Sequence, residues 1–136
     1  MYYTVNEDSI ADMVDTFYLA IRRDALLGPI FESAIGDHWT PHLAKMKAFW
    51  SSVLLASRTY KGNPMIAHLK LPLLTARHFE RWLELWRATA ANLCSPELAA
   101  LFVERAENIG VRLLSTISQF HGAAVREAAE AMSEAR

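Results

Sequence analysis

Two histidines, His42 and His68, are the side chains of this chain best suited to chemistry. His68 lies in a segment bounded by Pro64 and Pro72, which predicts a short helix because the residue before a proline avoids helical geometry. A neutral imidazole on a short, rigid helix can bind a metal through one ring nitrogen. Backbone carbonyls left without partners at the helix end can then hold the other N–H. The plainer interpretation is a half-buried histidine on an amphipathic helix.

His42 shares a helix face with Lys45, Met46 and Phe49, which follow it at the spacing of one and two helical turns. This pattern also suits an ordinary core stripe. The functional interpretation places Met46 and Phe49 over a flat apolar ligand, directs Lys45 outward to an acidic group on it, and holds His42 above a metal. Two imidazoles across an apolar gap are what an iron porphyrin needs, so we predict a haem site.

Two further side chains could donate hydrogen bonds into such a site. Tyr18 follows the core residue Phe17, and its hydroxyl either reaches water or, if buried, needs a partner such as a bound ligand. Most of the four tryptophans are expected in the core, but an indole N–H is a donor that cannot accept, and Trp82 is the best candidate to face a cavity.

The sequence gives little support for a zinc or di-iron site, a catalytic or nucleotide-binding motif, or a nucleic-acid or membrane partner. The five histidines and single cysteine lack the spacing of a zinc or di-iron site, and catalytic serine, P-loop and dinucleotide fingerprints are absent. Cys94 is expected to be a small core residue. The net charge of −1 without a basic stripe disfavours nucleic acid as a partner. No secretory start or membrane span is seen, so we expect a cytoplasmic location without membrane attachment.

Helix signals occur throughout, and no strand pattern does, so we predict an all-α fold. The 136 residues suffice for one domain with one core. The expected helices run from a Thr4–Glu7 capping box to about Arg23, over a short piece that ends near Gly36, from Thr40-Pro41 to about Ser57, over the short segment around His68, from Thr75, and from Ser95-Pro96 to about Gly122. We expect a domain over residues 1–122 and a helical or loose tail over residues 123–136.

Five strings in register resemble the truncated haemoglobins, specifically their third group. They are Phe17-Tyr18, Leu27-Gly28-Pro29-Ile30-Phe31, Trp39-x-x-His42-x-x-Lys45-x-x-x-Phe49-Trp50, His68-Leu69-x-Leu71-Pro72 and Phe79-x-x-Trp82-Leu83. The resemblance covers about residues 5–120. It departs at Met46, where the family more often has a branched aliphatic residue, and at Pro41, which restricts the swing of His42.

The resemblance implies a truncated globin fold, a two-over-two helical sandwich around haem b. It makes His68 the proximal iron ligand and places Phe31 against the porphyrin. On the distal side it places Tyr18, His42, Met46 and Trp82.

The implied function is the binding of O2, NO and CO at a histidine-ligated haem iron. Fixed donors in a dry pocket slow the loss of oxygen, which suits capture or chemistry better than transport. The alternatives are a redox enzyme, such as a nitric oxide dioxygenase or a peroxidase supplied with electrons by a partner reductase, and a haem-free helical interaction module.

Overall fold

The computed structural model describes residues 1–60, 75–113 and 115. Its labelled helices are α1 (Glu7–Arg23), α2 (Gly28–Ile35), α3 (Trp39–Leu55) and α5 (Ala76–Leu93), and residues 96–113 are also helical. The prediction of an all-α fold is confirmed. Outside the described residues lie the short helix expected around His68, the domain boundary at 122 and the tail 123–136.

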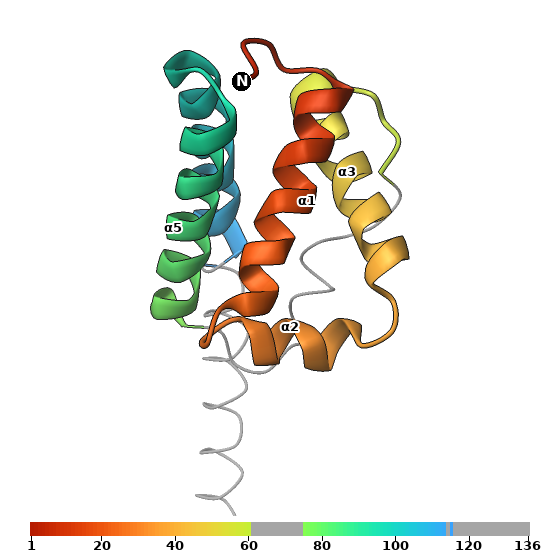
Figure 1. The fold of residues 1–136 in the computed structure, drawn as a ribbon, viewed down its shortest axis with the longest axis vertical. Helices are drawn as coiled ribbons and strands as arrows, with labels where there is room; N and C mark the ends of the chain where they lie inside the picture. Colours follow the sequence, from red (N-terminus) through yellow and green to blue (C-terminus); the bar gives the residue numbers. More distant parts are fainter. Residues whose placement is uncertain (61–74, 114, 116–136) are drawn as a thin grey trace, which may run out of the picture.

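Helix α1 is the centre of the molecule. It lies between α5 and α3, and α2 crosses its carboxyl end (Figure 1). Five of its apolar side chains recur at helical spacing with at most 1% exposure. Each such burial contributes roughly 1.5–3 kcal/mol, so this stripe makes α1 the element on which the others pack. The residues of the stripe are Ile10, Met13, Val14, Phe17 and Ile21.

The expected capping box at the start of α1 is wrong by two residues. Asn6 is the cap, since its Oδ1 accepts from the Ser9 backbone N–H at 2.8 Å, while the Ser9 hydroxyl accepts from the Asn6 N–H at 2.9 Å. Glu7 lies in the first turn and accepts a hydrogen bond from the Ser51 hydroxyl at 2.6 Å. The Glu7 carboxylate, which the sequence pattern assigned to the capping box, is thus bonded to Ser51 of α3, 44 residues further along the chain.

The expected start of α3 at Thr40-Pro41 is also displaced. The helix begins at Trp39, with His38 as its N-cap and no side-chain capping bond. Pro41 therefore stands in the first turn, where a missing N–H costs nothing because that group has no helical acceptor. The helix ends at Leu55, and Ala56 follows in the left-handed conformation.

The two later starts are confirmed at the expected residues. Thr75 is the N-cap of α5, and its backbone N–H donates to Nδ1 of His78 at 3.0 Å. The Ser95 hydroxyl accepts from the Leu98 N–H at 3.3 Å, and the chain is helical from residue 96. Cys94, between the two helices, is buried, as expected of a core residue.

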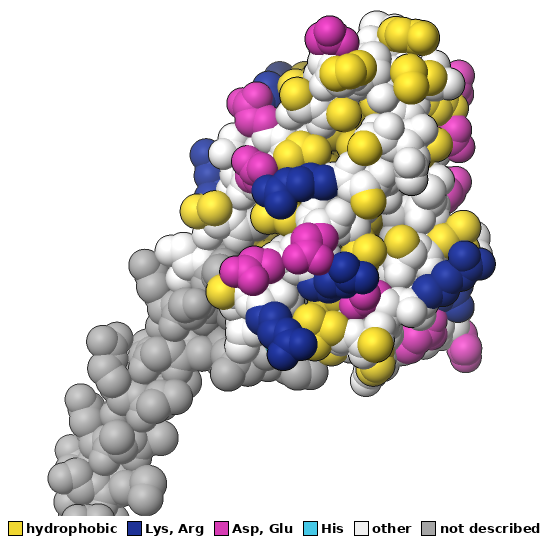
Figure 2. Space-filling model, turned by 60° about the vertical axis from the view of Figure 1, so that its left-hand side comes forward, with side chains coloured by type: hydrophobic (Ala, Val, Ile, Leu, Met, Phe, Trp, Pro, Cys, Tyr) yellow, Lys and Arg dark blue, Asp and Glu magenta, His cyan; other side chains and the backbone are white. Residues whose placement is uncertain are grey.

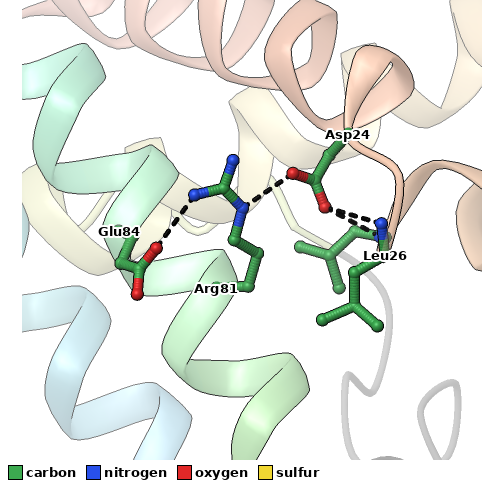
Figure 3. A network of polar contacts seen from close by, with 5 residues as sticks. Asp24, Leu26, Arg81 and Glu84 are labelled. Carbon is green, nitrogen blue, oxygen red and sulfur yellow. Dashed lines mark hydrogen bonds and ion pairs between the residues drawn. The ribbon is translucent and has the colours of Figure 1, made fainter.

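A buried carboxylate fastens the turn between α1 and α2 to α5 (Figure 3). Asp24, with 6% of its side chain exposed, accepts from the backbone N–H groups of Leu26 at 3.1 Å and Leu27 at 2.9 Å. Its other oxygen accepts from Nε of Arg81 at 2.7 Å. Burial alone would raise the pKa of Asp24, but the Leu27 N–H, Arg81 and the Leu26 N–H together hold that pKa below its ordinary value.

The surface carries charges of both signs. Basic and acidic side chains are interleaved on the face shown in Figure 2, and pairs such as Arg87 with Glu107, at 2.8 Å, link neighbouring helices. Among the described residues, no helix combines the length and the apolar character needed to cross a membrane.

We expect Asp24→Ala to lower the free energy of unfolding by about 2–3 kcal/mol, because it leaves two backbone donors and Arg81 without their buried acceptor. Chemical denaturation followed by circular dichroism measures this. The control is Glu84→Gln, which removes the exposed partner of Arg81 and should cost at most about 1 kcal/mol. Equal losses in the two variants would contradict the assignment.

The Asp24 contribution should also depend on pH. A carboxyl whose folded pKa is lowered stabilises fully above its unfolded pKa of about 3.9 and loses that effect as the pH falls through the folded pKa. The difference in unfolding free energy between the wild type and Asp24→Asn should therefore shrink below about pH 4. A difference that stays constant down to pH 2 would contradict this.

Gly28 allows α2 to start directly against the end of α1. A Cβ there would lie 2.9 Å from the Arg22 carbonyl oxygen and 3.3 Å from that of Ile21. We expect Gly28→Ala to destabilise the protein by about 1–3 kcal/mol in thermal or chemical unfolding. The matched control is Gly110→Ala, where the nearest atom is 3.7 Å away and a helix-favouring residue should be neutral or stabilising.

Candidate functional site

Tyr18 lies on the side of α1 that faces α2 and α3. Only 6% of the residue is exposed. Its ring centroid lies 5.1 Å from that of His42, with the rings at 89°, and 6.0 Å from those of both Phe31 and Trp39. Edge-on contacts of this kind hold each ring in one orientation. Three elements therefore place Tyr18, Phe31 and His42 together, all of which the sequence had assigned to one site.

The Tyr18 hydroxyl has no hydrogen-bond partner within the described ranges. Burial raises the pKa of the phenol above its ordinary value, so the group stays protonated and can donate throughout the physiological range. A buried hydroxyl ordinarily has a hydrogen-bond partner, because a buried donor without one lowers stability by about 1–3 kcal/mol. This donor is therefore available to a bound ligand.

The assigned residues of α3 share one partly covered face. His42, Met46 and Phe49 are half-buried, whereas Lys45 is exposed. Met46 and Phe49 pack against the edge of the core, and in the described part of the chain only Trp39, Trp50 and Ser51 of α3 are buried. Such a face, apolar but incompletely covered by described residues, fits a flat hydrophobic group, with Lys45 at its rim.

Trp82 of α5 is joined to Tyr18 through Phe17. The Phe17 ring stands edge-on to Trp82 at 5.5 Å and to Tyr18 at 5.1 Å. Trp82 is half-buried and stacks parallel to Trp86 at 6.1 Å and 2°. The stack fixes the Trp82 indole, whose N–H has no acceptor among the described residues.

Trp39 is a site residue to which the sequence patterns gave no role. Trp39, 8% exposed, closes the cluster because its ring contacts both Tyr18 and His42, the latter at 5.7 Å and 90°. Its indole N–H donates to Glu32, whose pKa Arg22 and then Trp39 hold below its ordinary value. The i, i+3 spacing of Trp39 and His42 was the available signal, but such spacing is common in helix cores.

His68 lies outside the described residues, so its assignment as metal ligand stays a prediction. The donor set of the described residues fits haem. A buried phenol O–H and an indole N–H have no described acceptor, and an imidazole stands beside an apolar helix face. Donors left without a described acceptor beside an apolar face suit a polar ligand bound to a flat group, as at a haem site.

Comparison with known proteins agrees with this interpretation. No family model matches the chain. The chain is 34% identical over 124 residues to the group 3 truncated hemoglobin ctb of Campylobacter jejuni, a match that covers 89% of this chain and 98% of the relative. The crystal structure of a group III truncated hemoglobin from Campylobacter jejuni superposes with a TM-score of 0.81 at 34% identity, covering 86% of this chain and 94% of that one.

The chain belongs to the group 3 truncated haemoglobins. The fold predicted from the five strings is thereby confirmed, and the protein is a globin-type haem protein that binds oxygen and other diatomic gases.

We expect Tyr18→Phe to keep the ligand-free protein at least as stable as the wild type, with a gain of up to about 2 kcal/mol, because it removes a buried hydroxyl that lacks a described partner. The comparison is Tyr2→Phe, which removes a hydroxyl that donates to Asp12 and should lower stability. Thermal unfolding of both variants measures this. A clear loss of stability in Tyr18→Phe would mean that the hydroxyl serves the fold.

Proposed function

We propose that the chain binds haem b in a two-over-two helical sandwich and that His68 would hold its iron. Phe31, His42, Met46, Phe49 and Trp82 would contact the porphyrin, and Lys45 would pair with a propionate at the rim. Bound haem would supply an iron atom with an open coordination position for O2, NO or CO. The half-buried apolar face of α3 and the ring of Phe31 support this placement.

The buried Tyr18 hydroxyl is the observation that carries the proposal. It is a neutral donor on a residue that is 6% exposed, and three neighbouring rings hold it in place. Fixed donors of this kind stabilise negative charge on a ligand atom without reorganisation. Trp82 is proposed as a second donor, and His42 as a donor or as the group that controls access. Tyr18, His42, Met46 and Trp82 would thus form the distal pocket.

The donors determine how long oxygen stays bound. Each hydrogen bond contributes on the order of 1 kcal/mol, so Tyr18 and Trp82 together would slow oxygen loss roughly tenfold to a hundredfold. Slow release favours capture or chemistry over oxygen transport. A cytoplasmic location and a globin domain over residues 1–122, with a separate tail, are parts of the same proposal.

A redox enzyme is the second candidate. Donors aimed at a polar ligand also suit reactions of nitric oxide or peroxide, and Tyr18 remains protonated at the required pH. Such turnover would need electrons from a reductase, because the sequence carries no dinucleotide fingerprint. Steady-state nitric oxide consumption with an added reductase tests it, and no turnover above that of free haem would reject it.

We expect Tyr18→Phe to raise the oxygen dissociation rate of the ferrous protein by about fivefold or more, because one hydrogen bond to the ligand is lost. Stopped-flow displacement of oxygen by carbon monoxide measures the rate. Carbon monoxide is the matched control ligand, since it accepts hydrogen bonds weakly and its dissociation should change much less. An unchanged oxygen off-rate would exclude Tyr18 from ligand binding.

We expect His68→Ala to abolish the five-coordinate ferrous haem spectrum of the wild type, because the axial imidazole is removed. Added free imidazole should restore it by filling the vacated space. His78→Ala is the control, since His78 caps α5 through the Thr75 N–H and should leave the spectrum unchanged. Normal haem binding by His68→Ala without imidazole would show that another residue is the ligand.

A further inference from the structure

Three side chains from three elements form a closed contact at one edge of the site. Arg22, at the end of α1, donates from Nε to Oε1 of Glu32 in α2 at 2.8 Å. The other Glu32 oxygen accepts from the indole N–H of Trp39 at 3.3 Å. The guanidinium carbon of Arg22 lies 4.4 Å from the centroid of the Trp39 ring, which adds a cation–π contact. We call this group of Arg22, Glu32 and Trp39 the Trp39 latch.

The latch adds a side-chain contact to a helix start that is fastened locally by His38, whose backbone N–H donates to the Ile35 carbonyl at 3.0 Å. Neither α2 nor α3 has a side-chain capping bond, and α3 has no acidic residue in its first turn. Only Gly36, Asp37 and His38 connect the two helices, and Gly36 takes a positive φ of 56° that most side chains disfavour. The contact between Glu32 and Trp39 spans this link from side chain to side chain, so together with the His38 bond it sets how the first turn of α3 lies on α2.

The latch reaches the site through ring contacts. Trp39 and His42 are one turn apart on α3, and their rings meet at 5.7 Å and 90°. His42 in turn stands 5.1 Å from Tyr18, and it is half-buried whereas the other two rings are buried. His42 is therefore the least buried residue of the three, although its Nε2 atom is itself buried, and its position depends on a helix turn held by Trp39.

We propose that Arg22 and Glu32 are positioning residues that, through Trp39, hold His42 over the ligand pocket and thereby limit the rate at which a diatomic gas reaches the space beside Tyr18. The inference rests on the proposed placement of that pocket. Ligand access would then be controlled by an exposed ion pair that is distant in sequence from His42. Opening the latch frees the first turn of α3, and the ligand then enters faster.

The latch is weak enough to be adjustable. The side chains of Arg22 and Glu32 are 42% and 44% exposed, and exposed pairs of this kind contribute little and are screened by salt. Their loss should therefore shift the balance between closed and open forms by about two- to fivefold, without unfolding the protein. The same weakness makes access sensitive to ionic strength.

The test uses carbon monoxide association with the ferrous haem protein, followed by flash photolysis. Glu32→Ala removes both bonds of the latch, and Glu32→Gln keeps an oxygen for the Trp39 N–H but loses the charge that holds Arg22. The control is Glu107→Ala, which breaks an exposed ion pair of the same 2.8 Å length elsewhere on the surface. Association should be about two- to fivefold faster in Glu32→Ala, intermediate in Glu32→Gln, and unchanged in Glu107→Ala.

A second readout separates positioning from general destabilisation. In ¹H–¹⁵N spectra of the carbon monoxide complex, Glu32→Ala should shift the Trp39 indole resonance, assigned with Trp39→Phe, together with the His42 ring resonances. Glu107→Ala should move neither. Raising the salt concentration should accelerate association in the wild type toward the rate of Glu32→Ala, and should leave that variant unaffected.

Unchanged or slower association in Glu32→Ala, or His42 resonances that do not move, would overturn the inference. This failure is distinguishable from failure of the proposed function. If Tyr18→Phe accelerates oxygen loss while Glu32→Ala changes nothing, the proposed ligand pocket is supported and the role of the Trp39 latch is rejected. If Tyr18→Phe has no effect while Glu32→Ala shifts His42, the latch couples the two rings but Tyr18 does not hold the ligand.

Discussion

The adjacent rings of Phe17 and Tyr18 are the contact on which the rest of the structure depends. Successive residues of a helix point about 100° apart, so these two side chains enter different halves of the molecule. Phe17 stands edge-on to Trp82 and Trp86 in the core, while Tyr18 faces Phe31, Trp39 and His42. One turn of α1 therefore fixes the position of the site relative to the core.

The two halves differ in how firmly they are held. On the core side, Trp86 is fully buried, stacks on Trp50 at 4.6 Å, and donates its indole N–H to the Phe102 carbonyl at 3.0 Å. Close packing of this kind leaves little freedom. On the site side, Asp24 holds the start of α2, whereas the side chains that hold the start of α3 to α2 are an exposed ion pair and ring contacts. A tightly packed core beside more weakly held helices suits a protein that must admit a small ligand and then retain it.

The site also illustrates how function departs from the rules of stability. The fold itself gives the Tyr18 hydroxyl no acceptor among the described residues, so phenylalanine at position 18 would serve the packing equally well. The same hydroxyl is useful only when a polar ligand lies against it. Groups that are left unsatisfied by the fold are therefore informative about ligands, provided that their burial keeps water away.

The sequence predicted a helix start correctly where only one residue could act as the N-cap. Thr75 and Ser95 begin helices as expected, since each offers a single cap in a clear position. Near Thr4 and Thr40 several polar residues compete. Asn6 caps α1 because the Ser9 hydroxyl can accept a hydrogen bond from the Asn6 N–H in return. His38 is the N-cap of α3, since Trp39 is already in the helix and its ring packs in the cluster.

The sequence by itself determined the all-α class, the family resemblance and the set of donors, because periodicity, proline positions and residue types are local properties. Only the tertiary structure decided that Tyr18 is buried and that its ring meets His42. It alone joined Arg22, Glu32 and Trp39, which come from three helices and lie together only when α2 packs across the end of α1. Contacts of that kind depend on the angles between helices, and no spacing along one helix encodes them.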